Sequence, residues 1–499
     1  MKHIGLALLI AGSFAAAAHA ADPVFEDHSV QLGGHIYSGD WEFFVGGGVA
    51  VMDCNADKRP DIFLSGGANA SALYVNEGNF NFALSDGPAV TDVTGAYPLD
   101  FDADGWMDLY VLRVGPDRLL QGGPDCTFED VTDAWGLPQT DRWSTAFTGW
   151  WEGDGRPTLA VGHYVDRADP EGPFEACDAN SLLRPEADGW RDEELEPGFC
   201  ALSILAAQDA RGRMTLRLSN DRHYYVRGGY EQMWDIKERR FLTEQDGWPR
   251  VSLWGMGIAS ADLTGDGRDE VMLTSMGDQL MQIAQADGTY KPAPFSIGTY
   301  AQRPFDGSDG RPSTGWHAQF GDINNDGRPD LFIAKGNVDQ MPTNAMEDPN
   351  NLLIQQADGT FAEKADVAGV ASKERSRGAA LADFDGDGRL DLMVVNRRAG
   401  AELYRNVTPD SGHWIGVSIT QPGGNRNAIG AVVTVTAGDL RLSQQVVVGG
   451  GHAGGQALPL HFGLSAATEA TIEIRWPDPA LRPVSVTVPV DRVIAISRQ

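Results

Sequence analysis

The sequence is poor in basic residues, and this shortage excludes one class of protein. Its 39 Lys and Arg stand against 70 Asp and Glu, a formal charge of -31. A surface this negative repels phosphate backbones and anionic lipids, which excludes nucleic-acid binding. Apolar residues nevertheless make up 42% of the chain, with 13 Trp, 20 Phe and 11 Tyr, too many for a disordered acidic chain. We therefore expect a folded protein whose partners are cations, cationic proteins or neutral ligands.

Long apolar runs are also scarce and are confined to the N-terminus. Lys2 gives a positive start, residues 4–18 are apolar, and Ala18-His19-Ala20 has the small-residue pattern of a cleavage site. We predict a signal peptide over residues 1–20 and export to the periplasm or the extracellular space. No later segment approaches the roughly 18 apolar residues that a membrane helix needs, so we expect no membrane insertion.

Cysteine is the third scarce residue, with only four copies. No C-x-x-C pair occurs, which argues against metal binding by thiolates. In an oxidising compartment an even number of cysteines favours disulfides. Cys177 and Cys200 bracket an acidic stretch, and we expect a bridge there; Cys54 and Cys126 are left as a possible second pair. We interpret residues 166–200 as an insert, either a recognition loop or a solvated acidic flap.

In place of these features, the sequence contains a repeated nine-residue motif close to D-x-[DN]-x-D-G-x-x-D. Each good copy precedes an apolar run, and the five good copies are Asp53–Asp61, Asp100–Asp108, Asp262–Glu270, Asp322–Asp330 and Asp383–Asp391. Two worn copies, which keep only some of the acidic and glycine positions of the motif, occur at 150–158 and 207–215, in the long gap between the second and third good copies. The seven starts are then 47 to 61 residues apart, which is the period of propeller blades.

The residues around the motif predict short strands. Small residues precede the loops, as in Gly48–Val51, Gly257–Ser260 and Gly378–Leu381; we expect these on innermost strands, because seven strands converge on one axis. We therefore predict an all-β protein, with a seven-bladed β-propeller over 21–408. Alternating apolar residues near Ile472 and Val486 predict strands in a small β-sandwich-like domain over 409–499.

The loop chemistry predicts Ca²⁺. Oxygens at positions 1, 3, 5 and 9 of the motif converge on one hard cation, and Gly at position 6 permits a tight turn. An EF-hand is excluded because its Glu at position 12 is replaced by Val111, Ile333 and Val394 in apparent strands. An Asp-rich turn without metal is the alternative for any single loop; recurrence at blade spacing favours metal. The predicted ligands are Asp53, Asn55, Asp57, Asp61, Asp100, Asp102, Asp104, Asp108, Asp262, Thr264, Asp266, Glu270, Asp322, Asn324, Asp326, Asp330, Asp383, Asp385, Asp387 and Asp391.

The loops are not equivalent. Lys58 stands where the first loop should have Gly, so weaker binding is expected there. The worn loops at 150 and 207 lack too many ligands, and we predict that they bind no metal.

These residues resemble the FG-GAP/VCBS repeat of integrin α subunits, over about residues 30–408. His413-Trp414-Ile415, Asn425–Ala431, Gly449–His452 and His461–Leu464 resemble the ASPIC/UnbV domain, which follows such a propeller in the cartilage acidic protein family. The resemblance implies an exported calcium-binding propeller and does not state its molecular activity.

Catalytic motifs are missing, which predicts a protein that is not an enzyme. There is no G-x-S-x-G, no H-E-x-x-H and no phosphate-binding Gly-rich loop ahead of a helix. Calcium would hold the clustered Asp residues ionised and occupied. Gly449–Gly455 is expected to be a turn or a flexible loop near a ligand.

Two function classes remain open, and the sequence does not indicate an oligomeric state. The first is a non-enzymatic scaffold for protein interaction or adhesion. The second is a lectin-like propeller that binds an extracellular glycan, since Trp and Tyr stack on sugar rings. An accessory part of a polysaccharide-acting enzyme is a third, weaker alternative.

Overall fold

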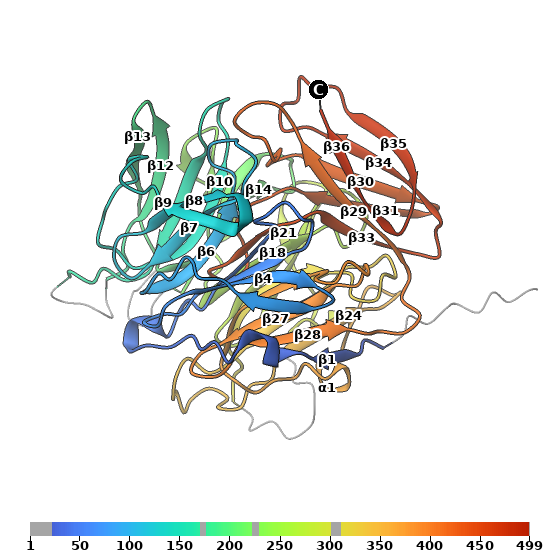
Figure 1. The fold of residues 1–499 in the computed structure, drawn as a ribbon, viewed down its shortest axis with the longest axis horizontal. Coiled ribbons are helices and arrows are strands. Elements are labelled where there is room, and N and C mark those ends of the chain that lie inside the picture. The colour runs from blue at the N-terminus through green and yellow to red at the C-terminus, as the bar shows by residue number, and fades with distance from the viewer. Residues whose placement is uncertain (1–21, 170–175, 222–228, 301–310, 499) are drawn as a thin grey trace, which may run out of the picture.

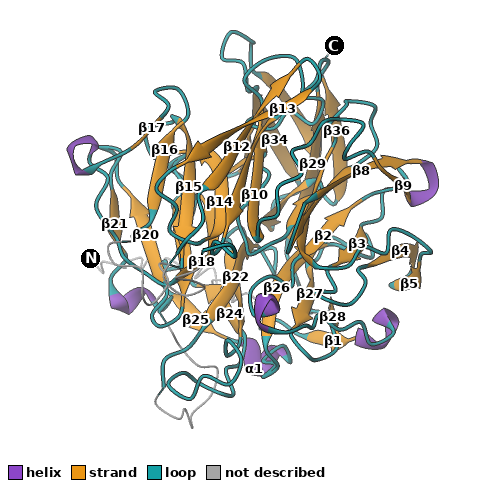
Figure 2. Cartoon of the chain, turned by 90° about the vertical axis from the view of Figure 1, so that its left-hand side faces the viewer, coloured by secondary structure: helices purple, strands orange, loops and turns teal. Residues whose placement is uncertain are grey.

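Short strands joined by turns make up almost all of the regular structure. The computed structural model of the chain describes residues 22–169, 176–221, 229–300 and 311–498, so the predicted signal peptide lies outside the described residues. Within those ranges no helix is long and apolar enough to cross a membrane. The few helical turns lie at the edges of the molecule (Figure 2), and they are η1 (Ser29–Leu32), η2 (Trp41–Phe43), η3 (Pro124–Cys126), η4 (Glu244–Asp246), η5 (Phe295–Ile297) and α1 (Ala365–Ala368).

Seven antiparallel sheets among the described residues correspond one to one to the seven motif starts. The innermost strands contact one another in chain order, and the last contacts the first, which closes a ring. From the axis outward the sheets are β2 (Val49–Met52), β3 (Asp61–Leu64), β4 (Ala72–Gly78), β5 (Asn81–Leu84); β6 (Val93–Leu99), β7 (Asp108–Arg113), β8 (Arg118–Gly123), β9 (Thr127–Asp130); β10 (Ser144–Trp150), β11 (Thr158–His163), β12 (Asn180–Glu186), β13 (Gly189–Leu195); β14 (Ala201–Gln208), β15 (Met214–Asn220), β16 (Gln232–Asp235), β17 (Arg240–Phe241); β18 (Gly255–Ala261), β19 (Glu270–Ser275), β20 (Leu280–Ala284), β21 (Tyr290–Pro292); β22 (Gly315–Gly321), β23 (Asp330–Lys335), β24 (Asn351–Gln355), β25 (Phe361–Glu363); and β26 (Ser376–Ala382), β27 (Asp391–Asn396), β28 (Glu402–Asn406). This is the predicted β-propeller.

The N-terminus of the described chain completes the last sheet. β1 (Phe25–Asp27) pairs with β28, with Phe25 opposite Asn406. The outer strand of the seventh sheet therefore comes from the start of the chain, and the ring is closed by strand pairing as well as by packing between sheets.

The stretch interpreted as an insert belongs mainly to the ring. Residues 180–195 form β12 and β13, the two outer strands of the third sheet. They follow a longer connection than in the other sheets, and their acidic residues range from half-buried, as at Asp192, to exposed, as at Glu194. The interpretation of residues 166–200 as an insert is wrong for this part. The expected bridge between Cys177 and Cys200 is present, and Cys54 pairs with Cys126.

The C-terminal segment forms two further sheets that face each other. One contains β33 (Leu460–Ser465), β29 (His413–Thr420) and β36 (Arg492–Ser497); the other contains β31 (Leu440–Gln445), β30 (Val432–Ala437), β34 (Glu469–Arg475) and β35 (Val484–Pro489). Ile415 and Phe462 from the first sheet share one buried core with Val433, Ile472 and Ile474 from the second. The predicted β-sandwich-like arrangement is therefore present.

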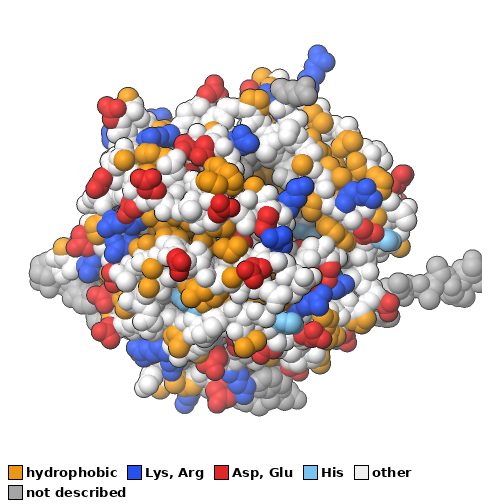
Figure 3. Space-filling view, viewed as in Figure 1, with side chains coloured by type: hydrophobic (Ala, Val, Ile, Leu, Met, Phe, Trp, Pro, Cys, Tyr) orange, Lys and Arg blue, Asp and Glu red, His pale blue; other side chains and the backbone are white. Residues whose placement is uncertain are grey.

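This C-terminal unit lies against the ring, where its strands gather at one side of Figure 1. One of its strands, β32 (Gly455–Ala457), leaves the unit and pairs in parallel with the innermost strand β2. The hydrophobic core of the ring lies between neighbouring sheets: Ala50 and Phe63 pack with Ala96 and Leu109 of the next sheet. Acidic and basic side chains are interspersed over the face seen in Figure 3, as expected for a solvated coat.

Candidate metal centres

Each Asp-rich motif forms the loop between the first and second strands of its sheet, so all seven loops lie at the same face of the ring. Position 9 is the first residue of the second strand in the five good copies, for example Asp61 in β3 and Asp391 in β27. The strands thus fix the two ends of each loop and bring positions 1 and 9 together.

The five good loops wrap around the carboxylate at position 1 in the same way. The backbone amide at position 6 donates to this carboxylate, at 2.8 Å from Lys58 to Asp53, 2.7 Å from Gly327 to Asp322 and 2.9 Å from Gly388 to Asp383. The residue at position 6 has a positive φ in these three loops, including Lys58, whose φ is 69°. The expected Gly-type turn therefore forms even where Gly is replaced.

The carboxylate at position 9 joins three segments of backbone. In Asp391, one oxygen accepts the amide of Phe384 at 2.8 Å and the other accepts the amide of Asn406 at 2.7 Å. Asp61, Asp108 and Asp330 make the same two bonds to position 2 and to the third strand of their sheets. All four are buried. Position 9 therefore has a structural role that does not require a cation.

Two loops bring three carboxylates together. Asp100, Asp102 and Asp108 have ligand atoms within 4.8 Å of one another, and so do Asp383, Asp385 and Asp391. Asp100 Oδ1 is buried and has no hydrogen-bond partner among the described residues. An unpaired buried carboxylate oxygen is costly, and a cation beside it would remove that cost. The donor set, all oxygen and mostly anionic, fits Ca²⁺ better than a soft metal.

The other three loops offer the same positions with neutral oxygens at position 3. Asn55, Thr264 and Asn324 occupy it, and the side-chain oxygens of Asn55 and Asn324 accept the position 5 amides of Asp57 and Asp326. These three loops therefore carry fewer negative charges than the Asp100 and Asp383 loops, and convergence of their ligand positions stays a prediction.

Arginine at position 7 was not anticipated from the sequence. In four loops it forms an ion pair with the predicted ligand at position 5: Arg59 with Asp57, Arg268 with Asp266, Arg328 with Asp326, and Arg389 with Asp387. The Asp100 loop has Trp106 there, so Asp104 lacks this partner. The recurrence of Arg two residues after an Asp was the available signal. These position 5 carboxylates point to Arg rather than into the cluster of positions 1, 3 and 9.

Burial and mutual repulsion shift the loop carboxylates toward their protonated forms. Burial raises the pKa of Asp108 to about 8 and that of Asp100 to about 6, with neighbouring carboxylates adding to both shifts. Burial likewise raises the pKa of Asp383 and of Glu270 to about 7. A divalent cation favours the ionised forms, so cation binding and proton release are coupled at these sites.

The worn loops have different partners. Glu152 forms an ion pair with Arg184, which reaches it from β12. Asp209 lies 2.6 Å from a guanidinium nitrogen of Arg213 at position 7. Neither loop contributes to a carboxylate cluster among the described residues.

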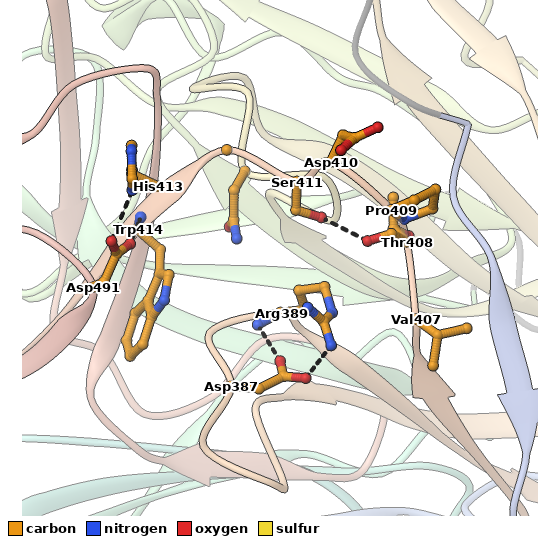
Figure 4. Close-up of a pocket in the computed structure, with 12 residues that line it drawn as sticks. Asp387, Arg389, Val407, Thr408, Pro409, Asp410, Ser411, His413, Trp414 and Asp491 are labelled. Atoms are coloured by element: carbon orange, nitrogen blue, oxygen red, sulfur yellow. Dashed lines mark hydrogen bonds and ion pairs between the residues drawn. The ribbon is translucent and has the colours of Figure 1, made fainter.

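A cavity of about 520 Å³ lies between the last two loops and the start of the C-terminal unit. Figure 4 shows His413 turned toward Asp491, with Nδ1 2.7 Å from Oδ2, and Arg389 paired with Asp387. The hydroxyl of Ser411 donates to the carbonyl of Thr408 on the opposite side. The three side chains Ser411, His413 and Asp491 therefore do not form a nucleophile–base–acid arrangement.

The fold and the repeated loops define a β-propeller with acidic inter-strand loops. Comparison with protein families gives the specific assignment: the FG-GAP-like repeat matches residues 53–111, 262–333 and 322–394, and the ASPIC and UnbV family matches 421–499. The chain therefore contains FG-GAP-like repeats and a C-terminal ASPIC and UnbV domain. All five good loops fall in the matched ranges, whereas the worn loops fall outside them.

Solved structures with a similar fold are distant in sequence, and no curated protein matches the chain. BBS1N in complex with ARL6DN is 10% identical, with a TM-score of 0.47 over 78% of this chain and 98% of that one. An Agrocybe aegerita lectin that recognises non-reducing terminal N-acetylglucosamine is 14% identical, with a TM-score of 0.35 over 64% and 79%. The extracellular domain of a putative hybrid two-component system from B. thetaiotaomicron is 7% identical, with a TM-score of 0.42 over 96% and 60%.

Proposed function

We propose that the protein is an exported, calcium-binding β-propeller that acts as a non-enzymatic scaffold for protein interaction. The observation that carries the calcium assignment is the Asp100 loop. Three carboxylates lie within 4.8 Å there, and the buried oxygen Oδ1 of Asp100 has no partner among the described residues. Four further loops share its backbone geometry. Two disulfides support a role outside the reducing cytoplasm.

In this proposal calcium stabilises the fold and takes no part in a reaction. The residues that would hold calcium are at positions 1, 3 and 9 of each good loop. The carboxylate at position 5 would also bind it if the ion pair with the Arg at position 7 opened. Because a ligand that binds only the folded state stabilises it by mass action, calcium should raise the melting temperature by several degrees over that in chelator. Magnesium, which prefers a rigid octahedral site, should have a smaller effect. Equal melting temperatures in calcium and in chelator would rule out this role.

The chemical nature of the bound partner, protein or carbohydrate, distinguishes the scaffold from its main alternative, a lectin-like propeller. A cavity of about 240 Å³ is lined by segments that precede β16 and follow β17 of the fourth sheet, including Tyr230, Trp248, Arg250 and Glu244. The Arg250 guanidinium lies 4.9 Å from the Tyr230 ring centre. An aromatic ring with polar neighbours is the usual chemistry of a sugar site, so this cavity favours carbohydrate binding as the second candidate.

Two measurements on the full chain decide between the candidates. Affinity capture from the exported fraction of the source cells, with calcium, should recover a specific protein partner if the scaffold proposal holds. A glycan array, run with the parent and with Tyr230→Ala, tests the alternative. Binding to one sugar class that Tyr230→Ala abolishes would replace the scaffold with a lectin.

A further inference from the structure

Residues 446–457, which lead from β31 toward β33, form a loop that lies against the innermost strands of the ring and is here called the axial hairpin. Its sequence is VVVGGGHAGGQA, between β31 and β33 of the C-terminal unit. The sequence predicts a turn or a flexible loop at Gly449–Gly455; the structure shows a bent segment that bonds to the innermost strands of the propeller.

The axial hairpin makes backbone bonds around most of the ring. The amide of Gly450 donates to Ile204 in β14 at 2.8 Å, and the amide of Gly451 donates to Ile258 in β18 at 2.7 Å. Gly454 bridges to β6, and β32 pairs with β2. Thr148 in β10 donates to the carbonyl of Val448. The hairpin thus supplies partners to inner-edge backbone groups that would otherwise face an open channel.

Glycine on both sides allows this close approach. A Cβ on Gly48 would lie 1.8 Å from the carbonyl oxygen of Ala453, and one on Gly95 would lie 1.7 Å from the same atom. A Cβ on Gly454 would lie 2.2 Å from the carbonyl oxygen of Val49. The small residues of the inner strands therefore make room for a peptide as well as for one another.

The tip of the axial hairpin is held by His452. Its ring is completely buried and lies 5.1 Å from the ring of Trp316. Nε2 accepts the amide of Gly46 at 3.2 Å, and the backbone amide of His452 donates to Nδ1 of His317 at 3.0 Å. The side chain at the tip thus anchors the hairpin to the first and sixth sheets.

The same C-terminal unit binds the outside of the Asp-rich loops. The amide of Ser465 donates to the carbonyl of Asn325 at 2.8 Å, and that of Gly412 donates to the carbonyl of Asn324 at 3.0 Å. Nε2 of His461 lies 3.0 Å from the carbonyl of Gly388. The C-terminal unit therefore contacts the backbone of loops whose side chains are the predicted cation ligands.

Both ends of the axial hairpin belong to the C-terminal sheets, which lie on the loop side of the ring. The hairpin therefore enters and leaves through one opening, and it can withdraw without threading the chain. We propose that the axial channel is a peptide-binding site, occupied by the chain's own glycine-rich hairpin, and that cation binding at the loops keeps the hairpin in place. The cation half of this inference rests on the proposed function.

The coupling follows from linkage. The cation and the C-terminal unit bind the same ordered conformation of the loops, one to the side chains and the other to the backbone. Two ligands that favour one conformation raise each other's affinity. Removing the cation should therefore weaken the binding of the C-terminal unit to the propeller, and removing the C-terminal unit should weaken cation binding.

The test uses the full chain with a protease site inserted at Asp410, which is exposed. After cleavage, size-exclusion chromatography is run in calcium and in chelator, and calcium binding is measured on the same sample. We expect the C-terminal fragment to co-elute with the propeller in calcium, to separate in chelator and to return when calcium is restored. The separated propeller, after circular dichroism and a cooperative melt show that it stays folded, should bind a fluorescent VVVGGGHAGGQA peptide.

Each other outcome overturns a distinct part. Co-elution in both conditions, with calcium bound, contradicts the cation latch. If the C-terminal fragment separates from the propeller in calcium as well as in chelator, although calcium is bound, the axial channel is not a peptide-binding site. Absence of calcium binding contradicts the proposed function and the latch, and the peptide assay then tests the channel alone.

A variant pair of peptides provides a second test on the same cleaved protein. A side chain at Gly454 cannot fit beside Val49, so the peptide carrying Gly454→Val should lose binding to the separated propeller. The peptide carrying Val446→Ala, at the entrance of the channel, should retain it. Equal binding of both peptides would contradict the position of Gly454 against Val49 in the channel. Because the change is made in the peptide, both measurements use the same propeller preparation.

Discussion

The backbone amide of Gly46 donates to Nε2 of His452, a residue 406 positions further along the chain, at 3.2 Å. Burial lowers the pKa of His452 to about 3, with the nearby Arg377 charge contributing, so the imidazole is neutral and its Nε2 accepts. This bond joins the beginning of the propeller to the tip of the axial hairpin. With β1 completing the last sheet, the first strand of the described chain and the axial hairpin both hold segments of the ring together.

Asp391→Asn should destabilise the protein even in chelator. Both carboxylate oxygens accept buried backbone amides, and an Asn side chain can satisfy only one of them. An unpaired buried donor costs about 1–3 kcal/mol, so the free energy of unfolding should fall by about 2 kcal/mol. Urea denaturation measures it. Asp104→Asn is the control: Asp104 is exposed, and its loss should leave stability in chelator unchanged.

Asp385→Ala should remove or weaken one calcium site, because Asp385 belongs to the carboxylate cluster of its loop. Asp209→Ala should leave the number of bound calcium ions unchanged, since Asp209 belongs to no carboxylate cluster among the described residues. Calorimetric titration of both variants measures the stoichiometry. The same loss of calcium in the two variants would contradict the distinction between good and worn loops.

Lys58→Gly should stabilise the calcium-free protein by about 1 kcal/mol. Lys58 has φ 69°, a left-handed conformation that costs a residue with a Cβ about 1–2 kcal/mol. Gly removes that strain and loses some of the gain to its greater freedom in the unfolded chain. Lys291→Gly, in an exposed strand position without a positive φ, should destabilise instead. A lower melting temperature for Lys58→Gly in chelator would refute the strain argument.

Calcium binding should release protons near neutral pH. The pKa of Asp108 is raised to about 8 and that of Asp100 to about 6, so part of the calcium-free population carries protons that the cation displaces. In chelator these raised values favour the folded state at low pH, and that contribution is lost as pH rises through about 8. Calorimetry at about pH 7 in buffers of different ionisation enthalpy should detect the release. Binding without proton exchange at that pH would disagree with these shifts.

The repeat made most of the fold predictable. Each good loop carries its own strand signal, and local loop chemistry does not depend on the rest of the chain. The positions of Asp100, Asp102 and Asp108 therefore followed from nine consecutive residues. The strands of the C-terminal unit were predictable for the same reason, from alternation at Ile472 and Ile474.

Contacts between distant segments were not predictable in this way. The axial hairpin bonds through backbone groups, which leave only glycine as a trace in the sequence, and Gly48, Gly95 and Gly454 are explained equally well by a crowded axis. The outer hairpin at 180–195 was misassigned because its acidic residues mask the strand pattern. The Arg at position 7 was visible, but pairing with position 5 is a side-chain geometry that composition does not fix.

The most direct test of the central claim is the number of calcium ions bound by the full chain at equilibrium, measured by titration calorimetry with equilibrium dialysis as a check. The account predicts five ions, at the loops that begin at Asp53, Asp100, Asp262, Asp322 and Asp383, with the first loop the weakest. Binding of no calcium by the folded protein would contradict it.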